Sequence, residues 1–180
     1  MIEYNNYSDI ELIDEIIKGD NSAFRYIIAR YEGQIARVVK GMLGECAEAE
    51  DIGQETFIRF YKSINKFRNE SQLGTYLTRI AINLSLNELK KRKKKQKIFS
   101  SDENKILKIS SKEVNNDINE MVTIALQSLD VKYRSVIVMR MLQGYDTKET
   151  AQILKIPVGT VLSRLSRAQD KLRILLKDFL

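Results

Sequence analysis

The stretch of sequence that decides the fold is residues 146–177, DTKETAQILKIPVGTVLSRLSRAQDKLRILLK. Apolar residues recur at helical spacing on both sides of Ile156 and Pro157, so this stretch predicts two helices joined by a tight turn. Asp146, followed three residues later by Glu149, forms a capping-box pattern that is expected to start the first helix. Pro157 cannot donate a hydrogen bond into that helix and restricts the preceding residue to an extended backbone.

The second of these helices is predicted to have two chemically different faces. Its apolar residues can face the protein: Val161, Leu165, Leu172 and Leu176. Its polar and basic residues lie largely on the other side: Ser163, Arg164, Ser166, Arg167 and Lys171. A short helix, a sharp turn and a longer helix with an Arg/Ser outer face are typical of a helix-turn-helix, whose second helix enters the major groove of DNA. These residues alone also allow an ordinary helical hairpin with a solvated basic face.

Composition sets the class of protein. The chain has 180 residues, of which 43% are hydrophobic, one is proline and eight are glycine, and this favours an all-α protein with two small helical domains. It has no apolar run of about 18 residues and no signal segment at its start, so we expect a cytoplasmic protein with no membrane insertion. Cys46 is the single cysteine and histidine is absent, which argues against an internal disulfide, a zinc site, an enzyme or a bound cofactor.

Charge is distributed unevenly along the chain. Residues 1–61 hold 6 Lys/Arg and 12 Asp/Glu, whereas residues 62–120 hold 14 and 7, and residues 121–180 hold 10 and 5. An acidic front and a basic remainder indicate two kinds of partner, a protein for the first and nucleic acid for the others.

Helical periodicity predicts four helices in the front half. Ser8 with Glu11 forms a capping box for the first, and a stripe from Phe24 to Met42 forms the apolar face of the second, which Gly41 and Gly44 are expected to end. A third helix is expected over residues 47–63, with Ile52, Phe57, Phe60, Tyr61 and Ile64 on its apolar side. Its polar side carries Glu50, Asp51, Gln54, Glu55 and Arg59, which serve either solubility and the helix dipole or the docking of a protein.

The fourth helix, after a polar break at residues 65–72, places Tyr76, Arg79, Asn83 and Asn87 on one stripe. An aromatic ring, a guanidinium and two amides on one face suit single-stranded bases, although a solvated face with a half-buried tyrosine is the alternative. Seven of the eight residues 90–97 are basic, a run that is usually frayed and solvated but also binds phosphates.

Residues 98–119 change to a polar composition that is typical of a linker with little fixed structure, which separates a front domain (1–97) from a back domain (120–180). In the back domain, Asp130 can cap a helix that is apolar through Val136, Ile137, Met139 and Met141 and closes at Gly144.

The chain resembles a known family, the extracytoplasmic-function (ECF) group of bacterial RNA polymerase sigma factors. Residues 49–67, AEDIGQETFIRFYKSINKF, resemble the segment that holds the coiled-coil of the largest polymerase subunit. Residues 75–91, TYLTRIAINLSLNELKK, resemble the minus-ten recognition helix, and residues 132–176 are similar to the minus-thirty-five domain. The resemblance implies a sigma factor that binds the RNA polymerase core, directs it to promoters and helps to melt the minus-ten element, with an anti-sigma protein as a further partner.

The resemblance also implies roles for individual residues. The core polymerase contact would involve Asp51, Gln54, Glu55 and Phe57. The melted minus-ten DNA would contact Phe67, Arg68, Asn69, Glu70, Ser71, Tyr76, Arg79 and Asn83. The double-stranded minus-thirty-five DNA would contact Thr160, Ser163, Arg164, Ser166, Arg167 and Lys171. Leu162 stands where many relatives carry a basic residue, which indicates a different promoter preference, and Tyr76 stands where tryptophan is more frequent.

Two other functions remain compatible with the residues. One is a helix-turn-helix transcriptional regulator that is not a polymerase subunit, which would bind duplex DNA on its own, as a dimer on a palindrome. The other is an interaction protein whose acidic front domain docks a helical partner, and such a chain would not need the Arg/Ser helix.

Overall fold

The computed structural model describes residues 4–99 and 118–177, and every regular element in these two ranges is helical. The elements of the first range are α1 (Asp9–Ile17), η1 (Asn21–Ala23), α2 (Phe24–Leu43), α3 (Ala47–Lys62), η2 (Ile64–Lys66) and α4 (Leu73–Phe99). Those of the second are α5 (Ile118–Ser128), α6 (Val131–Ile137), η3 (Val138–Leu142), α7 (Thr147–Leu154) and α8 (Val158–Lys177). This arrangement confirms the all-α class with two helical domains, while residues 100–117 of the predicted linker lie outside the described ranges.

Both predicted capping boxes are present. At the start of α1 the Glu11 carboxylate accepts from the Ser8 backbone N–H at 2.7 Å, and the Ser8 hydroxyl accepts in return from Glu11 N–H. At the start of α7 the Asp146 and Glu149 pair makes the same reciprocal bonds, at 2.7 and 2.8 Å. Asp130 stands at the N-cap of α6, but its side chain makes no capping hydrogen bond.

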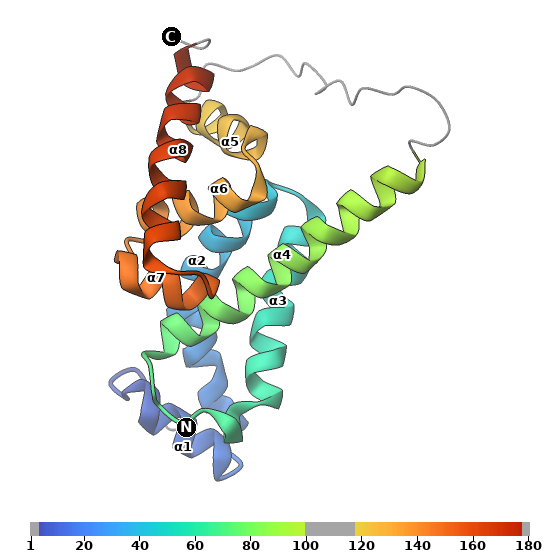
Figure 1. The fold of residues 1–180 in the computed structure, drawn as a ribbon. Helices are drawn as coiled ribbons and strands as arrows, with labels where there is room; N and C mark the ends of the chain where they lie inside the picture. The colour runs from blue at the N-terminus through green and yellow to red at the C-terminus, as the bar shows by residue number, and fades with distance from the viewer. Residues whose placement is uncertain (1–3, 100–117, 178–180) are drawn as a thin grey trace.

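The front domain is a bundle in which α2, α3 and α4 pack against one another and α1 closes one end (Figure 1). The predicted stripe on α2 forms its centre, since Ile27, Ile35 and Met42 are fully buried. On α3 the prediction is confirmed for Phe60, which is fully buried, but Tyr61 is 39% exposed and donates its hydroxyl to Asn21 instead.

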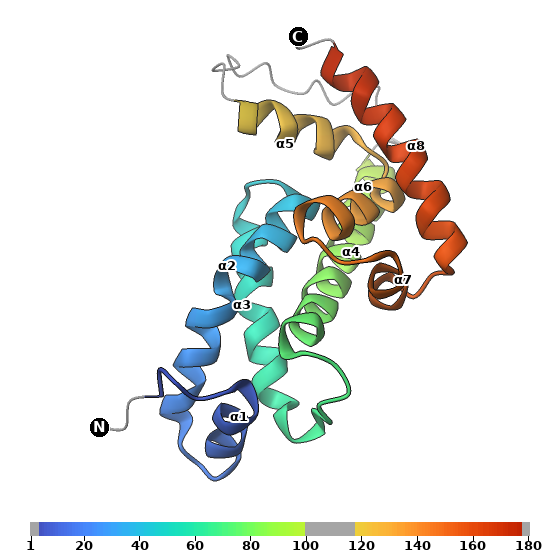
Figure 2. The ribbon, with the colours of Figure 1, turned by 90° about the vertical axis from the view of Figure 1, so that its left-hand side faces the viewer.

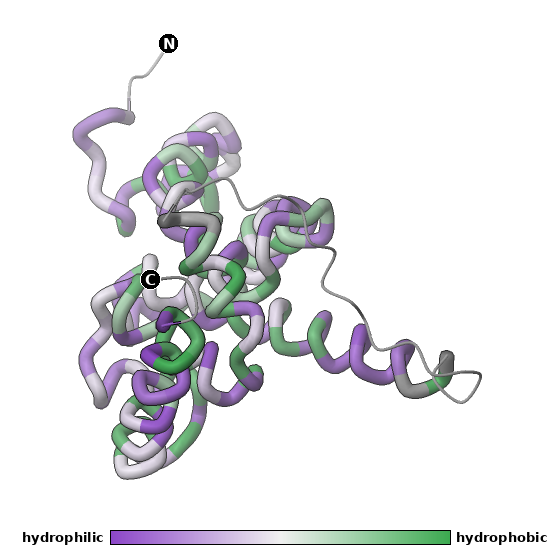
Figure 3. The backbone as a smooth tube through the Cα atoms, turned by 90° about the horizontal axis from the view of Figure 1, so that it is seen from above, coloured by the Kyte–Doolittle hydropathy of each residue, from purple (hydrophilic) through white to green (hydrophobic). Residues whose placement is uncertain are grey.

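The long helix α4 continues through the basic run that was expected to fray. Its last turns project away from the rest of the described chain (Figure 3). Arg92 lies on this part of the helix and pairs with Glu88 at 3.4 Å and with Glu48 of α3 at 3.3 Å. These ion pairs are partly exposed, so each contributes little to stability, but they align one side of the basic run with α3.

The back domain builds its core from α5, α6, α7 and α8. Two small apolar clusters hold it together, one around Val136, Ala151 and Val161, and one around Leu126, Leu129, Tyr133, Ile137 and Ala168. Of the apolar residues predicted for the helix after Asp130, Val136, Ile137 and Met139 are buried, whereas Met141, in the π-helix η3, is 56% exposed. Among the described residues, no helix has both the length and the apolar character that crossing a membrane requires.

The two domains pack directly on each other, with α6 and α7 lying against α2 and α4 (Figure 2). Val138, Met139, Tyr145 and Ile153 of the back domain belong to the same buried apolar cluster as the front-domain core. Polar groups close the contact: the Gln34 amide donates to the Tyr145 hydroxyl at 3.0 Å, and this hydroxyl donates to Thr78 at 3.0 Å.

Arg134 is a buried polar residue at the contact between the two domains. Its guanidinium is buried and donates to the backbone oxygen of Met42 at 2.6 Å across the domain boundary, and to the backbone oxygens of Gln127 and Leu129 within its own domain. Burial lowers the pKa of this guanidinium below its usual value, since desolvation disfavours the charged form. The carbonyl oxygens that surround it satisfy most of its donors, so Arg134 joins the end of α2 to the α5–α6 turn.

Gly41 does not end α2, contrary to the prediction from sequence. The helix runs through it to Leu43, and Gly44, with φ of 80°, is the residue that stops it. A Cβ atom at Gly41 would lie only 3.0 Å from Val138 and 3.4 Å from Leu142. The glycine therefore serves the close approach of α2 to η3, a tertiary contact that helical periodicity does not reveal.

The Gly41→Leu substitution should separate α2 from η3, because its side chain has no room at this contact. We expect a loss of about 1–3 kcal/mol in the free energy of unfolding, typical of overpacking, measured by urea denaturation. Gly33→Leu, on the same helix, is the matched control, since the one atom near its Cβ is the flexible Arg37 guanidinium at 3.6 Å. Equal stability of the two variants would contradict the importance of this close approach.

Candidate protein and nucleic-acid interfaces

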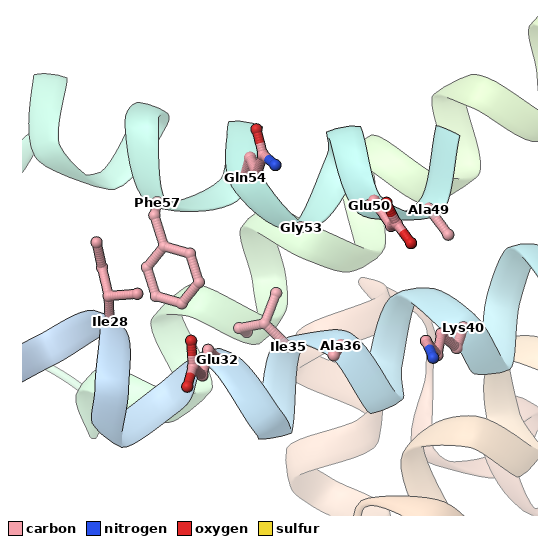
Figure 4. Close-up of a pocket in the computed structure, with 10 residues that line it drawn as sticks. All are labelled: Ile28, Glu32, Ile35, Ala36, Lys40, Ala49, Glu50, Gly53, Gln54 and Phe57. Atoms are coloured by element: carbon pink, nitrogen blue, oxygen red, sulfur yellow. The ribbon is translucent and has the colours of Figure 1, made fainter. Parts of the chain in front are cut away.

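A groove of about 220 Å³ runs between α2 and α3 on the surface of the front domain (Figure 4). Its lining residues are Ile28, Glu32, Ile35, Ala36 and Lys40 of α2, and Ala49, Glu50, Gly53, Gln54 and Phe57 of α3. The floor is apolar, whereas the carboxylates of Glu32 and Glu50 stand at its rim with the ammonium of Lys40, which pairs with Glu45 at 3.0 Å (Figure 4). An apolar floor with an acidic rim suits a helix that carries both apolar and basic side chains.

Gly53 explains why this groove is open. A Cβ atom built at this position would meet no atom within 4 Å, so the glycine is not required for the packing of the front domain. Glycine inside a helix costs roughly 1 kcal/mol relative to alanine. The absence of a side chain here leaves space between the two helices for a side chain from outside.

The four residues predicted for the core polymerase contact divide into two sets. Gln54 and Phe57 line the groove, whereas Asp51 and Glu55 do not. Glu55 accepts a hydrogen bond from Arg59 at 2.7 Å on the outer side of α3. The α2 wall of the groove, with Ile28, Glu32 and Ala36, was not predicted from sequence, because Ile28 was assigned to the core with the rest of the apolar stripe.

An aromatic cluster holds the loop that precedes α4. The ring of Phe67 lies edge-on to Tyr76, with centroids 5.1 Å apart, and both rings lie edge-on to Phe60 at 6.1 and 6.0 Å. Edge-to-face contacts of this kind stabilise a pair by about 0.5–1.5 kcal/mol beyond the area that they bury. The cluster therefore fixes both ends of residues 68–72, a short loop with no regular structure.

The predicted minus-ten residues lie on and after this loop. Arg68, Asn69 and Glu70 are exposed, Ser71 is half-buried, and Asn69 has a φ of 55°, in the left-handed region that asparagine tolerates. On α4, Asn83 is exposed and Arg79 is half-buried, with a buried Nε that has no hydrogen-bond partner. Asn83 lies ten residues beyond the start of α4 and hence about 15 Å along its axis.

The helix-turn-helix has the geometry that its sequence predicts. Lys155, at φ 53°, ends α7 in the left-handed conformation, and α8 starts directly after Pro157. Val161 and Ala168 are fully buried against the domain. The predicted DNA-contacting side is open: Ser163, Ser166, Arg167 and Lys171 are exposed, and Thr160 and Arg164 are half-buried.

The basic groups of α8 differ in their surroundings. Within the described ranges, Arg173 of α8 forms an ion pair with Asp170, whereas neither Arg164 nor Arg167 forms one. The Lys171 ammonium lies over the Tyr133 ring of α6, 5.4 Å from its centroid, and is oriented by that contact. Ser163 donates its hydroxyl to the backbone oxygen of Thr160 at 3.2 Å. Among the described residues, this face thus combines a serine with two arginines that form no ion pair, and such side chains can bond to base edges or phosphates.

Two protein families match separate parts of this chain. Residues 27–95 match the family Sigma-70 region 2, and residues 120–172 match the family Sigma-70, region 4. The ECF RNA polymerase sigma factor SigW of Bacillus subtilis (strain 168) is 35% identical over 184 residues, covering 92% of this chain and 95% of the relative. The ECF RNA polymerase sigma-E factor of Haemophilus influenzae is 31% identical over 175 residues, covering 91% and 92%.

Solved structures show a similar fold. The sigma factor RpoE from Bartonella quintana, crystallised in complex with the anti-sigma factor NepR, has a TM-score of 0.70 at 22% identity, covering 86% of this chain and 96% of that one. CnrH, in complex with the cytosolic domain of CnrY, has a TM-score of 0.69 at 23% identity, covering 93% and 96%.

A region 2 bundle followed by a region 4 helix-turn-helix defines a sigma factor of the sigma-70 type. This chain belongs to the extracytoplasmic-function group of RNA polymerase sigma factors. It is a transcription initiation factor that directs RNA polymerase to promoters and not an enzyme, as its sequence predicts.

Replacing Tyr76 tests the role of the aromatic cluster in holding the loop. We expect Tyr76→Ala to lower the free energy of unfolding by about 2 kcal/mol, since it removes two edge-to-face contacts. Amide hydrogen exchange at residues 68–71 should accelerate, because Phe67 loses its support. Tyr76→Phe keeps the ring and is the matched control, so exchange as fast in Tyr76→Phe as in Tyr76→Ala would contradict this role.

Proposed function

We propose that the groove between α2 and α3 is the site where this sigma factor binds the RNA polymerase core. The proposal is supported by the match to sigma-70 region 2 over residues 27–95, which includes both walls of the groove. Its acidic rim and apolar floor complement an amphipathic helix with basic side chains. Gln54 and Phe57 would contact this helix inside the groove, and Asp51 and Glu55 would lie beside it as a negatively charged margin that attracts the helix.

The loop after η2 and the start of α4 would capture unpaired bases of the minus-ten element. Opening a few base pairs costs several kcal/mol of stacking, so the domain must bind the unpaired strand more tightly than the duplex by a comparable amount. The exposed Arg68, Asn69 and Glu70 offer hydrogen-bonding groups for base edges, and the cluster behind them keeps the loop in place. Asn83 and Arg79 would contact the strand farther along α4.

Helix α8 would recognise duplex DNA of the minus-thirty-five element in the major groove. The observation that carries this function is the open Arg/Ser face of α8, held by buried Val161 and Ala168 in a domain that matches sigma-70 region 4. Thr160, Ser163 and Ser166 would contact bases or phosphates from the first turns. Arg164, Arg167 and Lys171 would lie along one flank, toward the phosphates.

A regulator that is not a polymerase subunit is the other function that the sequence allows. It would account for the helix-turn-helix but gives no role to the groove or to the sigma-70 region 2 match. In vitro transcription distinguishes the two, because core enzyme and a sigma factor together give promoter-specific transcripts, whereas core enzyme and a regulator that is not a polymerase subunit give none.

We also propose that an anti-sigma protein inhibits this chain in the cytoplasm. The solved structures that share the fold each contain a partner: the sigma factor RpoE is in complex with an anti-sigma factor, and CnrH is in complex with the cytosolic domain of CnrY. Copurification from the native host would test this, and repeated recovery of polymerase without an inhibitor would count against it.

Filling the groove should weaken binding to the polymerase core. We expect Gly53→Leu to lower the affinity for core enzyme by at least about tenfold, since its side chain occupies space that the partner would enter. Binding of fluorescently labelled protein to core polymerase measures the effect. Gly33→Leu is the control, because it adds the same side chain to α2 outside the groove.

Removing a guanidinium from α8 should weaken promoter binding by the complete polymerase. Where the guanidinium reads a base, we expect Arg164→Ala and Arg167→Ala each to weaken the free energy of promoter binding by about 1–3 kcal/mol. Where the guanidinium contacts a phosphate, we expect the slope of the logarithm of the binding constant against the logarithm of salt concentration to fall by about 1. Salt-dependent promoter binding by holoenzyme distinguishes these two cases. Arg173→Ala is the control, since Arg173 lies on the same helix but pairs with Asp170 at 3.3 Å. Unchanged promoter occupancy in both variants would contradict groove reading by α8.

A further inference from the structure

Two large apolar side chains are exposed on the first turns of α8. Val158 is 43% exposed and Leu162 is 53% exposed. They are four residues apart in one helix, so they are neighbours on its surface. Single exposed leucines are common and need no explanation, but an adjacent pair at the start of a recognition helix occupies the part that lies deepest in the groove.

Helical geometry places this pair on the outside of the domain. An α-helix turns by about 100° per residue, so Leu162 lies about 100° from buried Val161 and about 120° from buried Ala168. Ser166 is only about 40° from Leu162 around the axis, whereas Arg167 is about 140° away on the far flank. The outer face of α8 therefore has an apolar edge and a basic edge, with serines between them.

The two edges suit different parts of a base pair in the major groove. The guanidinium groups of the basic edge can bind guanine or phosphate, but a guanidinium group does not recognise a methyl group. In the major groove, thymine is the base that presents an apolar group, its 5-methyl, and an aliphatic side chain is the natural contact for it. Contact with this methyl would also remove apolar surface of Leu162 from water.

We propose that Leu162, supported by Val158, is a specificity-determining residue that recognises the 5-methyl group of thymine in an A·T pair of the upstream promoter element. This inference rests on the proposed placement of α8 in the major groove. It goes beyond that placement because it names the base that one side chain selects and the chemical group through which it does so.

The test uses the complete polymerase, assembled from core enzyme and the full chain. Wild-type holoenzyme first selects promoters from a duplex library randomised in the upstream element. In the selected promoter, each thymine is then replaced singly by deoxyuridine, which pairs in the same way but lacks the 5-methyl group. We expect one such replacement to weaken wild-type binding by about fourfold, the change that corresponds to one methyl-sized apolar contact.

The same replacement should have almost no effect on the Leu162→Ala holoenzyme, since the side chain that contacts the methyl is gone. Leu162→Arg should select guanine at this position in place of thymine, because arginine reads guanine in the major groove. Ile174→Ala is the matched control, since Ile174 is 65% exposed on the same helix but lies three turns farther along. It should keep the wild-type sensitivity to deoxyuridine.

The outcomes separate this inference from the function on which it rests. A holoenzyme that selects no promoter contradicts the proposed function and the inference together. A selected promoter in which every deoxyuridine costs the same in wild type and in Leu162→Ala overturns the inference alone. It is also overturned if Leu162→Ala leaves the selected bases unchanged and weakens binding to core polymerase, which would make Leu162 a protein contact.

Discussion

The close approach of α2 to η3 at Gly41 is the contact on which the rest of this structure depends. Helix α2 is central to the molecule, since it packs against α1, α3 and α4 of the front domain and against α5, α6 and η3 of the back domain. Val138 can reach it because residue 41 has no side chain, and the two domains consequently share one apolar core. Arg134 and Gln34 add hydrogen bonds between the two domains.

The same helix links the structural role to the functional one. The buried face of α2 packs against both domains, and one of its outer edges forms the wall of the groove opposite Gln54 and Phe57. Rigid packing behind a surface keeps the binding groups in position and lowers the entropy lost on binding. The front-domain groove and the loop before α4 are thus presented by one well-packed bundle, while α8 is presented by a smaller domain fastened to it.

Local sequence signals predicted much of this fold, because they act within a few residues. The capping boxes at Ser8 and Asp146 and the break at Pro157 are of this kind, and all are present. Gly41 could not be assigned from sequence, since its role depends on Val138, almost a hundred residues away. Gln54 and Phe57, which were predicted to contact the polymerase core, line the groove, but periodicity cannot separate apolar residues that face a core from those, such as Ile28, that border an open surface. The family resemblance supplied the roles of the loop residues, which no local pattern indicates.

Because the two domains share one apolar core, separating them costs free energy. Any state in which the back domain leaves α2 must expose Val138, Met139, Tyr145 and Ile153 to water and must leave the Met42 carbonyl without its guanidinium. A ligand that binds only such a separated state has its apparent affinity reduced by the fraction of molecules in that state. Variants at Gly41 that weaken the packing between the two domains would then bind this ligand more tightly, although they change none of the residues that contact it. The strength of the packing between the domains therefore sets the apparent affinity for such a ligand.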